Sequence, residues 1–336
     1  MNTAQCATPA TDTAPVPPQP IPGPRSADRL AEAALLLATV VWGSSFAWAK
    51  ASGDAINRLS GAGAHAAMGP LLLMGCRFLL AGLLWLAIFP RSRRGWSLPS
   101  LRRSLVLGLL LSGGLVLQVL GLDRTSEAVS AFLTSLTILW VPAIMTLAMR
   151  RPPQRIFWFG IALAGGGIWL MTGAMPGGIG VGEALGLACS IAFSFHIIAL
   201  NLLTPRDDPA RLTAGQFLLV GAVGLLACAL VPSGRHLMEP AAVNSILSDR
   251  QVWTHLVLLV LLPTIVSFGL MFYFQPRVDP TRATLIYLTE PIFAATYAWI
   301  LVGRRLGMMQ MVGAGLILAA NLLVELWGSG IRAGRK

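Results

Sequence analysis

Residues 253–274 read WTHLVLLVLLPTIVSFGLMFYF, without an aspartate, glutamate, lysine or arginine. A helix needs about 20 predominantly apolar residues to cross the hydrocarbon core of a bilayer, so this stretch predicts a transmembrane helix. Comparable runs recur at 31–50, 68–89, 104–121, 128–149, 156–173, 182–203, 213–231, 283–302 and 307–327. None shows the two-residue alternation of a membrane β-barrel strand. The sequence therefore predicts an all-α membrane protein with ten transmembrane helices.

The composition excludes a soluble protein. Of the 336 residues, 55% are hydrophobic and only 12% are charged, whereas soluble domains carry about 25% charged residues. The four cysteines are too few for a disulfide framework, and three of them lie inside apolar runs. Residues 1–28 contain seven prolines and little hydrophobicity, which predicts a disordered tail.

The distribution of positive charge predicts the orientation of the chain. The net charge of +11 comes from arginines between the hydrophobic runs, so membrane orientation explains it better than nucleic-acid binding. With the N-terminus inside, the inner segments hold 17 lysines and arginines and the outer segments hold 7. This bias places both termini in the cytoplasm. The excess of arginine over lysine, 23 against 2, favours a bacterial source and hence the bacterial cytoplasmic (inner) membrane.

The two halves of the chain align without a gap at an offset of 153 residues from the third run onward. Arg124 then falls on Arg277, Ser130 on Ala283, Arg151 on Arg304, Gly160 on Gly313 and Leu163 on Leu316. Five helices per half is an odd number, so the second copy must enter the membrane inverted. Inverted repeats are common in secondary transporters, which bind substrate at the repeat interface. This architecture needs the first run, so Ala47-Trp48-Ala49 is interpreted as part of an uncleaved signal-anchor and not as a cleavage site.

Five short motifs occur in order along this pattern. They are Trp42-Gly43-Ser44-Ser45-Phe46; Arg77-Phe78-Leu79-Leu80-Ala81; Thr264, Gln275 and Thr284-Leu285-Ile286; Glu290-Pro291-Ile292-Phe293-Ala294-Ala295; and Gln310 with Gly313 and Ala314. Together they resemble the EamA-type branch of the drug/metabolite transporter superfamily, over residues 29–328. The family usually has Gly-Glu after the fourth and ninth helices, where this chain has Met149-Arg150-Arg151 and Gly303-Arg304-Arg305.

The resemblance implies a fold and a function. It implies two five-helix repeats, at 29–174 and 180–328, with both termini in the cytoplasm. It also implies secondary transport, usually export, of amino acids or other small metabolites and drugs through a cavity between the repeats. The implied site draws on helices one, three, four, six, eight and nine.

Two residues that are ordinarily charged at neutral pH lie well inside the predicted helices, where a charge is costly without a partner or a function. Glu290, beside the helix-breaking Pro291, is expected either to line the pathway or to tie a kinked helix to its neighbour. On the pathway it would bind a cationic substrate group or a coupling proton. Arg77 is expected to have a structural role, with binding of a substrate carboxylate as the alternative.

Other polar residues are predicted with less specific roles. His196 is either a proton relay or, more simply, a hydrogen-bonded packing residue. Lys50 and Glu183 fall at helix ends, where snorkelling to the interface accounts for them. Uncharged polar groups within helices either form a cavity wall or bond neighbouring helices. The full set predicted for the substrate pathway and coupling is Glu290, Tyr287, Gln275, Thr264, Trp42, Ser44, Ser45, Gln118, Thr134, Thr137 and His196.

The alternative to a transporter is a polytopic membrane enzyme that acts on a lipid. Such an enzyme would carry clustered acidic or histidine residues near one face. The sequence has no Walker loop, no His-Glu-x-x-His, no nucleophile elbow and no metal-spaced Cys/His cluster. We therefore expect no enzyme activity, cofactor, metal or nucleic-acid partner. The expected partners are a small-molecule substrate and the lipid bilayer, with proton coupling and the choice between monomer and homodimer left open.

Overall fold

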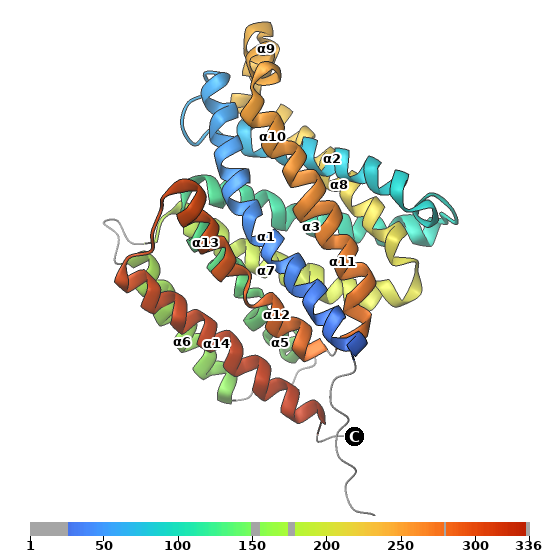
Figure 1. Ribbon diagram of the computed structural model, residues 1–336, viewed down its shortest axis with the longest axis vertical. Helices are drawn as coiled ribbons and strands as arrows, with labels where there is room; N and C mark the ends of the chain where they lie inside the picture. The colour runs from blue at the N-terminus through green and yellow to red at the C-terminus, as the bar shows by residue number, and fades with distance from the viewer. Residues whose placement is uncertain (1–25, 149–154, 174–178, 279, 334–336) are drawn as a thin grey trace, which may run out of the picture.

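The computed structural model describes residues 26–148, 155–173, 179–278 and 280–333. The first half contains α1 (Ser26–Leu59), α2 (Met68–Ile88), α3 (Leu98–Arg124), α4 (Glu127–Ser135), α5 (Thr137–Ala148) and α6 (Arg155–Ile168). The second half contains α7 (Val181–Leu203), α8 (Pro209–Leu230), α9 (Pro240–Ser248), α10 (Arg250–Leu259), α11 (Ser267–Phe274), α12 (Pro280–Tyr287), α13 (Glu290–Val302) and α14 (Met308–Ala333). The described residues contain no β-strand (Figure 1).

Short helical turns complete the chain path. They are η1 (Pro90–Arg93), η3 (Thr204–Arg206), η4 (Pro232–Met238) and η6 (Gln275–Arg277), with wider π-helical turns at η2 (Trp169–Gly173) and η5 (Val260–Val266). Continuous runs of these elements form ten candidate membrane spans in the described part of the chain. The fourth span joins α4 to α5, the eighth joins α10, η5 and α11, and the ninth joins α12 to α13. The predicted ten-helix, all-α fold is confirmed.

The first helix differs from its predicted bounds at both ends. It begins at Ser26, within the predicted tail, and continues to Leu59, beyond the end expected at Lys50. Residues 1–25 of that tail lie outside the described residues, as do Met149-Arg150-Arg151. Lys50 therefore lies inside the helix and not at its end, and its ammonium group is bonded inside the protein, as described below.

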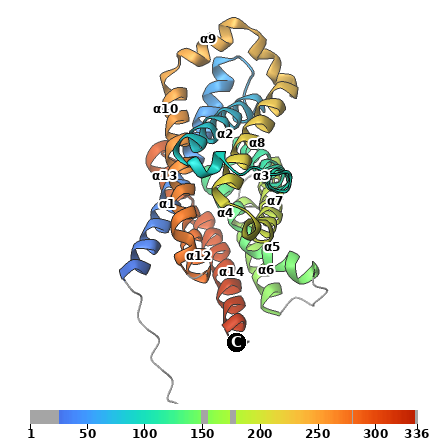
Figure 2. The same cartoon turned by 90° about the vertical axis from the view of Figure 1, so that its right-hand side faces the viewer.

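Helix packing shows the twofold repeat directly. α2 packs on α8 and α6 packs on α14, so the second span meets the seventh and the fifth meets the tenth. α1 packs on the eighth and ninth spans, and α7, which begins the second half, packs on the third and fourth. Exchanging the two halves therefore leaves this pattern of contacts unchanged. α2 lies beside α8, and α6 beside α14, in both views (Figures 1 and 2).

Glycines allow the closest of these helix contacts. A Cβ atom built on Gly224 of α8 would lie 2.7 Å from the Cα of Gly75 in α2. One built on Gly313 of α14 would lie 2.5 Å from the carbonyl oxygen of Gly167 in α6. Small residues let membrane helices approach closely and pack without a hydrophobic driving force. Glycines thus allow close packing at both contacts between equivalent spans of the two repeats, the second with the seventh and the fifth with the tenth.

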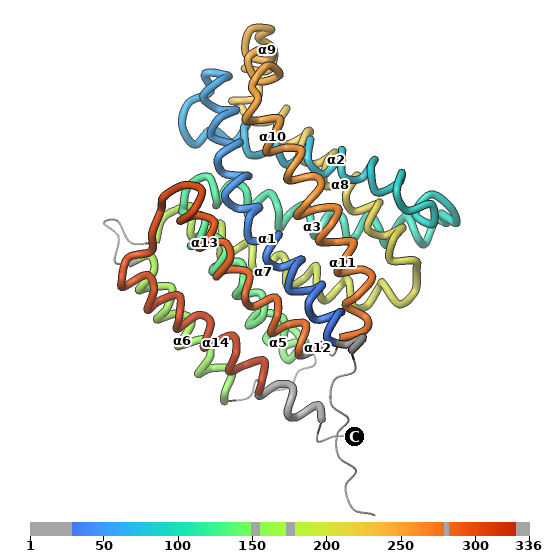
Figure 3. Tube along the Cα trace, in the orientation of Figure 1, coloured from blue at the N-terminus to red at the C-terminus, as the bar shows by residue number. Residues whose placement is uncertain are grey.

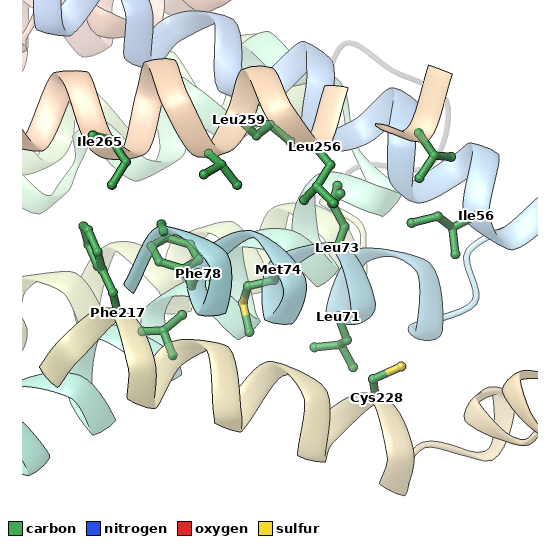
Figure 4. Packing of buried hydrophobic residues seen from close by; sticks show 14 of the residues in the cluster. Ile56, Leu71, Leu73, Met74, Phe78, Phe217, Cys228, Leu256, Leu259 and Ile265 are labelled. Carbon is green, nitrogen blue, oxygen red and sulfur yellow. The ribbon is translucent and has the colours of Figure 1, made fainter. Parts of the chain in front are cut away.

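Buried apolar side chains hold α2 between α8 and the eighth span. Leu71, Met74 and Phe78 of α2 pack in one cluster with Phe217 and Cys228 of α8 and with Leu256, Leu259 and Ile265 of the eighth span (Figure 4). Trp85 is fully buried in the same cluster, and its indole Nε1 donates a hydrogen bond to the carbonyl oxygen of Ala210. This cluster fixes one wall of the cavity described below.

The fourth and ninth spans are interrupted at equivalent positions. α4 ends at Ser135 and α5 begins at Thr137, while α12 ends at Tyr287 and α13 begins at Glu290. The offset of 153 residues that relates Arg124 to Arg277 also relates Thr137 to Glu290. Pro291 lies in the first turn of α13, where its missing N–H leaves no helical hydrogen bond unmade. The kink expected at Glu290-Pro291 is thus a break shared by both repeats.

The bundle has two distinct ends. The short helix α9 lies at one end, and the start of α1 and the end of α14 lie toward the other (Figures 1 and 3). We call these the α9 end and the terminal end. α1 runs from the terminal end and contacts α9 (Figure 1). In the loop after α1, His65 is bonded to Asp123 at the end of α3, and Glu127 at the start of α4 is bonded to Arg304 in the loop after α13, so we assign these contacts to the α9 end.

Candidate functional site

A small cavity lies among α1, α2 and α3, with Leu259 of α10 closing one side. Its volume of about 40 Å³ leaves room for about three water molecules. The walls are mixed: apolar residues such as Phe46, Leu73 and Phe78 alternate with polar ones. The polar lining residues are Ser45, Lys50, Arg77, Gln118 and Asp123.

Arg77 reaches this cavity from the middle of α2. Its Nε donates a hydrogen bond to Oγ1 of Thr264, at 2.8 Å, and its guanidinium carbon lies 5.0 Å from the centroid of the Phe78 ring. Thr264 is fully buried in the π-helical turn η5, where its own hydroxyl donates to the carbonyl oxygen of Leu259. The π-helical turn η5 thus presents Oγ1 of Thr264 as a hydrogen-bond acceptor, which orients the guanidinium group of Arg77.

Lys50 also lines the cavity, and its placement corrects the sequence-based expectation. Its Nζ donates to the carbonyl oxygens of Leu122, at 2.7 Å, and Asp123, at 2.9 Å, at the end of α3. The residue is 8% exposed, so the ammonium group does not snorkel to the interface. Two carbonyl groups near a helix C-terminus are favourable partners for a cation.

Gln118 and Thr134, both predicted for the pathway, contact each other. Gln118 Nε2 lies 3.3 Å from Thr134 Oγ1, which itself donates to the carbonyl oxygen of Ser130. Thr137 is buried one turn further on and donates to the carbonyl oxygens of Thr134 and Ser190. Gln118 faces the cavity, whereas Thr137 joins the break in the fourth span to α7.

A second group of predicted residues surrounds Trp42. Its indole Nε1 donates to the carbonyl oxygen of Pro263, at 2.8 Å, within η5. The rings of Trp42 and Tyr287 have centroids 5.8 Å apart, and the Tyr287 hydroxyl lies 3.1 Å from Oε1 of Gln275. Four predicted site residues, Trp42, Thr264, Gln275 and Tyr287, are therefore linked through η5 and the end of α12.

Glu290 lies at the start of α13 and is partly buried. α13 is held close to α1, because a Cβ atom on Gly43 would lie 2.7 Å from Cβ of Phe293. Glu290 is not among the residues that line the cavity. Its carboxylate takes part in none of the ion pairs among the described residues.

Two predicted pathway residues have packing partners. The Ser44 hydroxyl is buried and donates to the carbonyl oxygen of Val41 in the same helix. His196 Nε2 lies 2.7 Å from Oε1 of Gln216, a contact that joins α7 to α8. Neither residue lines the cavity.

Buried charges meet at the α9 end. Glu127, which is 2% exposed, accepts a hydrogen bond from Arg304 at 3.4 Å. Asp123 Oδ2 lies 3.1 Å from Nδ1 of His65. Glu183, which was also expected to snorkel, is 9% exposed and accepts a hydrogen bond from Thr125 at 2.6 Å. Together with Lys50, these contacts join α1, α3, α4, α7 and the loop after α13.

Asp123 is the lining residue that the sequence pattern did not single out. It lies directly after the apolar run 104–121 and next to Arg124, so it reads as an ordinary helix-end charge. The position of Lys50 could have been recognised from the residues that follow it. They continue an amphipathic helical pattern, which places the lysine within a longer helix and not at a helix end. In the described ranges, no group of three or more His, Cys, Asp or Glu side chains has the arrangement of a metal site.

Comparison with known proteins adds an independent result. The EamA-like transporter family matches residues 29–173 and 180–326. The chain is 27% identical to an uncharacterized inner membrane transporter, YedA, of Escherichia coli (strain K12) over 266 residues, 76% of this chain and 82% of the relative. It is 27% identical to a probable amino-acid metabolite efflux pump of Salmonella typhimurium over 309 residues, 88% of this chain and 95% of the relative. One solved crystal structure shares the fold with a TM-score of 0.58 at 18% identity, over 89% of this chain and 98% of the other.

Proposed function

Because the chain belongs to the EamA-like transporter family, we propose that it exports amino acids or other small metabolites by alternating access. The proposal rests chiefly on one observation: a cavity with charged and polar walls lies inside a ten-helix twofold repeat. A polar cavity within apolar helices is costly unless a polar ligand or water occupies it. The two repeats, 29–174 and 180–328, would move relative to each other around it.

The contacts at the α9 end support a state closed at that end. Asp123 and Glu127 are each at most 3% exposed there, and both are bonded to cations or to His65. At the terminal end, the Arg282–Glu32 pair that joins α12 to α1 is much more exposed, with side chains 55% and 31% exposed. Exposed pairs stabilise a contact by at most about 1 kcal/mol. In this proposal, substrate enters from the terminal end and leaves after the α9 end opens.

The orientation follows from the charge bias and gives export its direction. We place both termini in the cytoplasm of a bacterial cell, since the predicted inner segments hold 17 of the basic residues against 7. A reporter fused after Lys336 is then expected to be active only in the cytoplasm, and one inserted between Pro232 and Gln251 only outside. Activity of both reporters on the same face would contradict the ten-span topology.

The predicted pathway residues differ in how close they lie to the cavity. Ser45 and Gln118 line the cavity, Thr134 is bonded to Gln118, and Thr264 holds Arg77. Trp42, Tyr287 and Gln275 are linked around η5, and the proposed route passes them toward the terminal end. Glu290 begins α13 beside this group and is proposed as the coupling residue. The enzyme alternative is not favoured, since the cavity gathers no cluster of acidic or histidine side chains.

Transport by the purified protein tests the proposal. The full chain would be reconstituted into liposomes that are loaded with radiolabelled amino acids and other small metabolites, and efflux would be compared with protein-free liposomes. We expect saturable efflux of at least one compound. Saturable efflux of none of them, from protein that is folded by thermal unfolding, would contradict the proposed function.

A further inference from the structure

Arg77 carries a positive charge into the cavity that no carboxylate neutralises. Its Nε is bonded to the neutral hydroxyl of Thr264, and its other close contact is the face of Phe78. None of the ion pairs among the described residues includes Arg77. Its two terminal amino groups form no hydrogen bond with any described residue, and the residue lines the cavity. These groups are therefore free to donate to a ligand.

Lys50 brings a second positive charge to the same cavity. Its ammonium group donates to two neutral carbonyl oxygens, those of Leu122 and Asp123, and an ammonium group has three donors. Among the lining residues the acidic group is Asp123, and its Oδ2 is already 3.1 Å from Nδ1 of His65. Among the lining residues, two cations thus face one partly engaged carboxylate. Lys50 also feels the carboxylates of Asp54 and Glu127, which lie outside the lining, so the excess of positive charge in the cavity is centred on Arg77.

This excess favours an anionic ligand. An unneutralised charge within the hydrocarbon region is costly, and an incoming anion offsets that cost. The planar guanidinium group presents two parallel N–H donors that match the two oxygens of a carboxylate. The cavity has room for about three water molecules, which a carboxylate would displace, and the apolar wall of Phe46 and Leu73 lies beside that space.

We propose that Arg77 binds the carboxylate of the transported substrate, with Lys50 supplying the second positive charge, so that the protein selects small molecules that carry an acidic group. This inference rests on the proposed transport function and gives it a chemical selectivity. It assigns Arg77 to substrate binding, where the sequence favoured a structural role. Thr264 is then a positioning residue, because its bond to Nε turns the terminal amino groups toward the cavity.

The selectivity can be measured as binding, without transport. The purified full chain in detergent would be titrated with a panel of amino acids and with the matching amino-acid amides, which keep the side chain and the amine but lack the carboxylate. Thermal unfolding reports binding, since a ligand of the folded state raises the Tm. We expect at least one amino acid to raise the Tm and its amide to bind about tenfold more weakly or worse.

Variants separate binding by Arg77 from a purely structural role. R77Q is expected to remove the difference between acid and amide, and R77K to reduce it, because lysine keeps the charge without the fork. T264V keeps Arg77 and is expected to weaken acid binding, and T264S to restore it. S112A is the matched control, because Ser112 is buried in α3, is bonded to Gly108 of its own helix, and does not line the cavity.

The outcomes distinguish this inference from the proposed function. Amides that bind as tightly as the acids, no amino acid bound at all, or full acid–amide discrimination in a folded R77Q variant would each overturn it. If R77Q does not fold, the T264V and R77K variants replace it. Full acid–amide discrimination in both of these single variants would also overturn the inference. Absence of efflux from liposomes with acid-selective, Arg77-dependent binding intact would instead contradict the transport function alone.

Discussion

Nη1 of Arg304 lies 3.4 Å from Oε2 of Glu127, so the loop after α13 is tied to the first turn of α4. These residues belong to different repeats and are 177 positions apart. Members of the family usually carry a glutamate at the position of Arg304. In this chain the arginine at that position contacts Glu127. Because α13 and α4 also pack together, the ion pair closes the α9 end between the two halves.

Reversing the Arg304–Glu127 pair tests this closure. The R304E variant is expected to lower the Tm, since it places two carboxylates together, and the double variant E127R/R304E is expected to recover part of the loss. The Arg304 side chain is 50% exposed, so the pair itself stabilises the fold by about 1 kcal/mol or less. Thermal unfolding of the single and double variants gives the coupling, and no recovery in the double variant would mean that the two residues act independently.

Replacing Glu290 tests its proposed role in coupling. E290Q keeps the shape of the side chain and removes its titratable carboxyl group, so we expect normal amounts of protein in the membrane with transport lost or insensitive to pH. The measurement is efflux from liposomes over a range of external pH. E239Q is the control, since Glu239 is an exposed carboxylate in the segment between η4 and α9. Unchanged rate and pH profile in E290Q would reduce Glu290 to a packing residue.

Asp207, between η3 and α8, is expected to make the stability of the fold depend on pH in the acid range. Burial favours its neutral form, but hydrogen bonds from the Asp208 amide and Arg103, with the charge of Arg211, outweigh burial and lower the pKa of Asp207. A carboxyl group with a lowered pKa stabilises the fold at pH values above its unfolded-state pKa of about 3.9. That contribution is lost as the pH falls through the folded-state value, so the Tm should fall in this acid range.

The D207N variant isolates the contribution of Asp207. Its side chain is 3% exposed and lies 2.7 Å from Arg211 and 3.1 Å from Arg103. Losing charged hydrogen bonds of this kind costs about 1.5–3 kcal/mol, so the variant should be destabilised at pH 7 and its Tm should fall less on acidification. The check is thermal unfolding from pH 7 to pH 3. If the Tm of D207N and of the wild type fell equally between pH 7 and pH 3, other carboxylates would determine the loss of stability in acid.

A single added methyl group tests the contact between α2 and α8. G224A is expected to destabilise the fold, because the new Cβ would lie 2.7 Å from the backbone of Gly75 and neither backbone can yield. G166A is the matched control, since the added Cβ would meet nothing within 4 Å. Alanine favours a helix over glycine by about 0.5–1 kcal/mol, so G166A should be neutral or stabilising. Equal Tm values for the two variants would argue against close packing at Gly224.

The number of spans could be predicted because a membrane helix has a local signature. Its length and low charge are visible in stretches such as 253–274, without any knowledge of neighbouring helices. The break at Glu290 was signalled by Pro291, whereas the equivalent break at Thr137, which has no neighbouring proline, was not predicted. The end of α1 was not predicted from the local pattern, because a lysine after an apolar run usually marks the membrane interface, whereas here carbonyl groups of α3 accept the hydrogen bonds of Lys50 inside the protein.

The site was less predictable for the same reason. Arg77 and Thr264 are 187 positions apart, and their contact depends on the π-helical turn in the eighth span. Residue type alone could not separate Ser45, which lines the cavity, from Ser44, which bonds to its own helix. Likewise, His196 faces Gln216 because of how α7 crosses α8. Such pairings are set by tertiary packing and not by local pattern.

The most direct test of transport through this cavity is substrate protection of a cysteine placed in its wall. Ser45 would be replaced by cysteine in a chain whose four native cysteines are changed to alanine, with S112C as the buried control. The account predicts that a small hydrophilic thiol reagent labels S45C and blocks efflux, that a transported compound slows the labelling, and that S112C stays unlabelled. Efflux that continues unchanged through fully labelled S45C protein would contradict it.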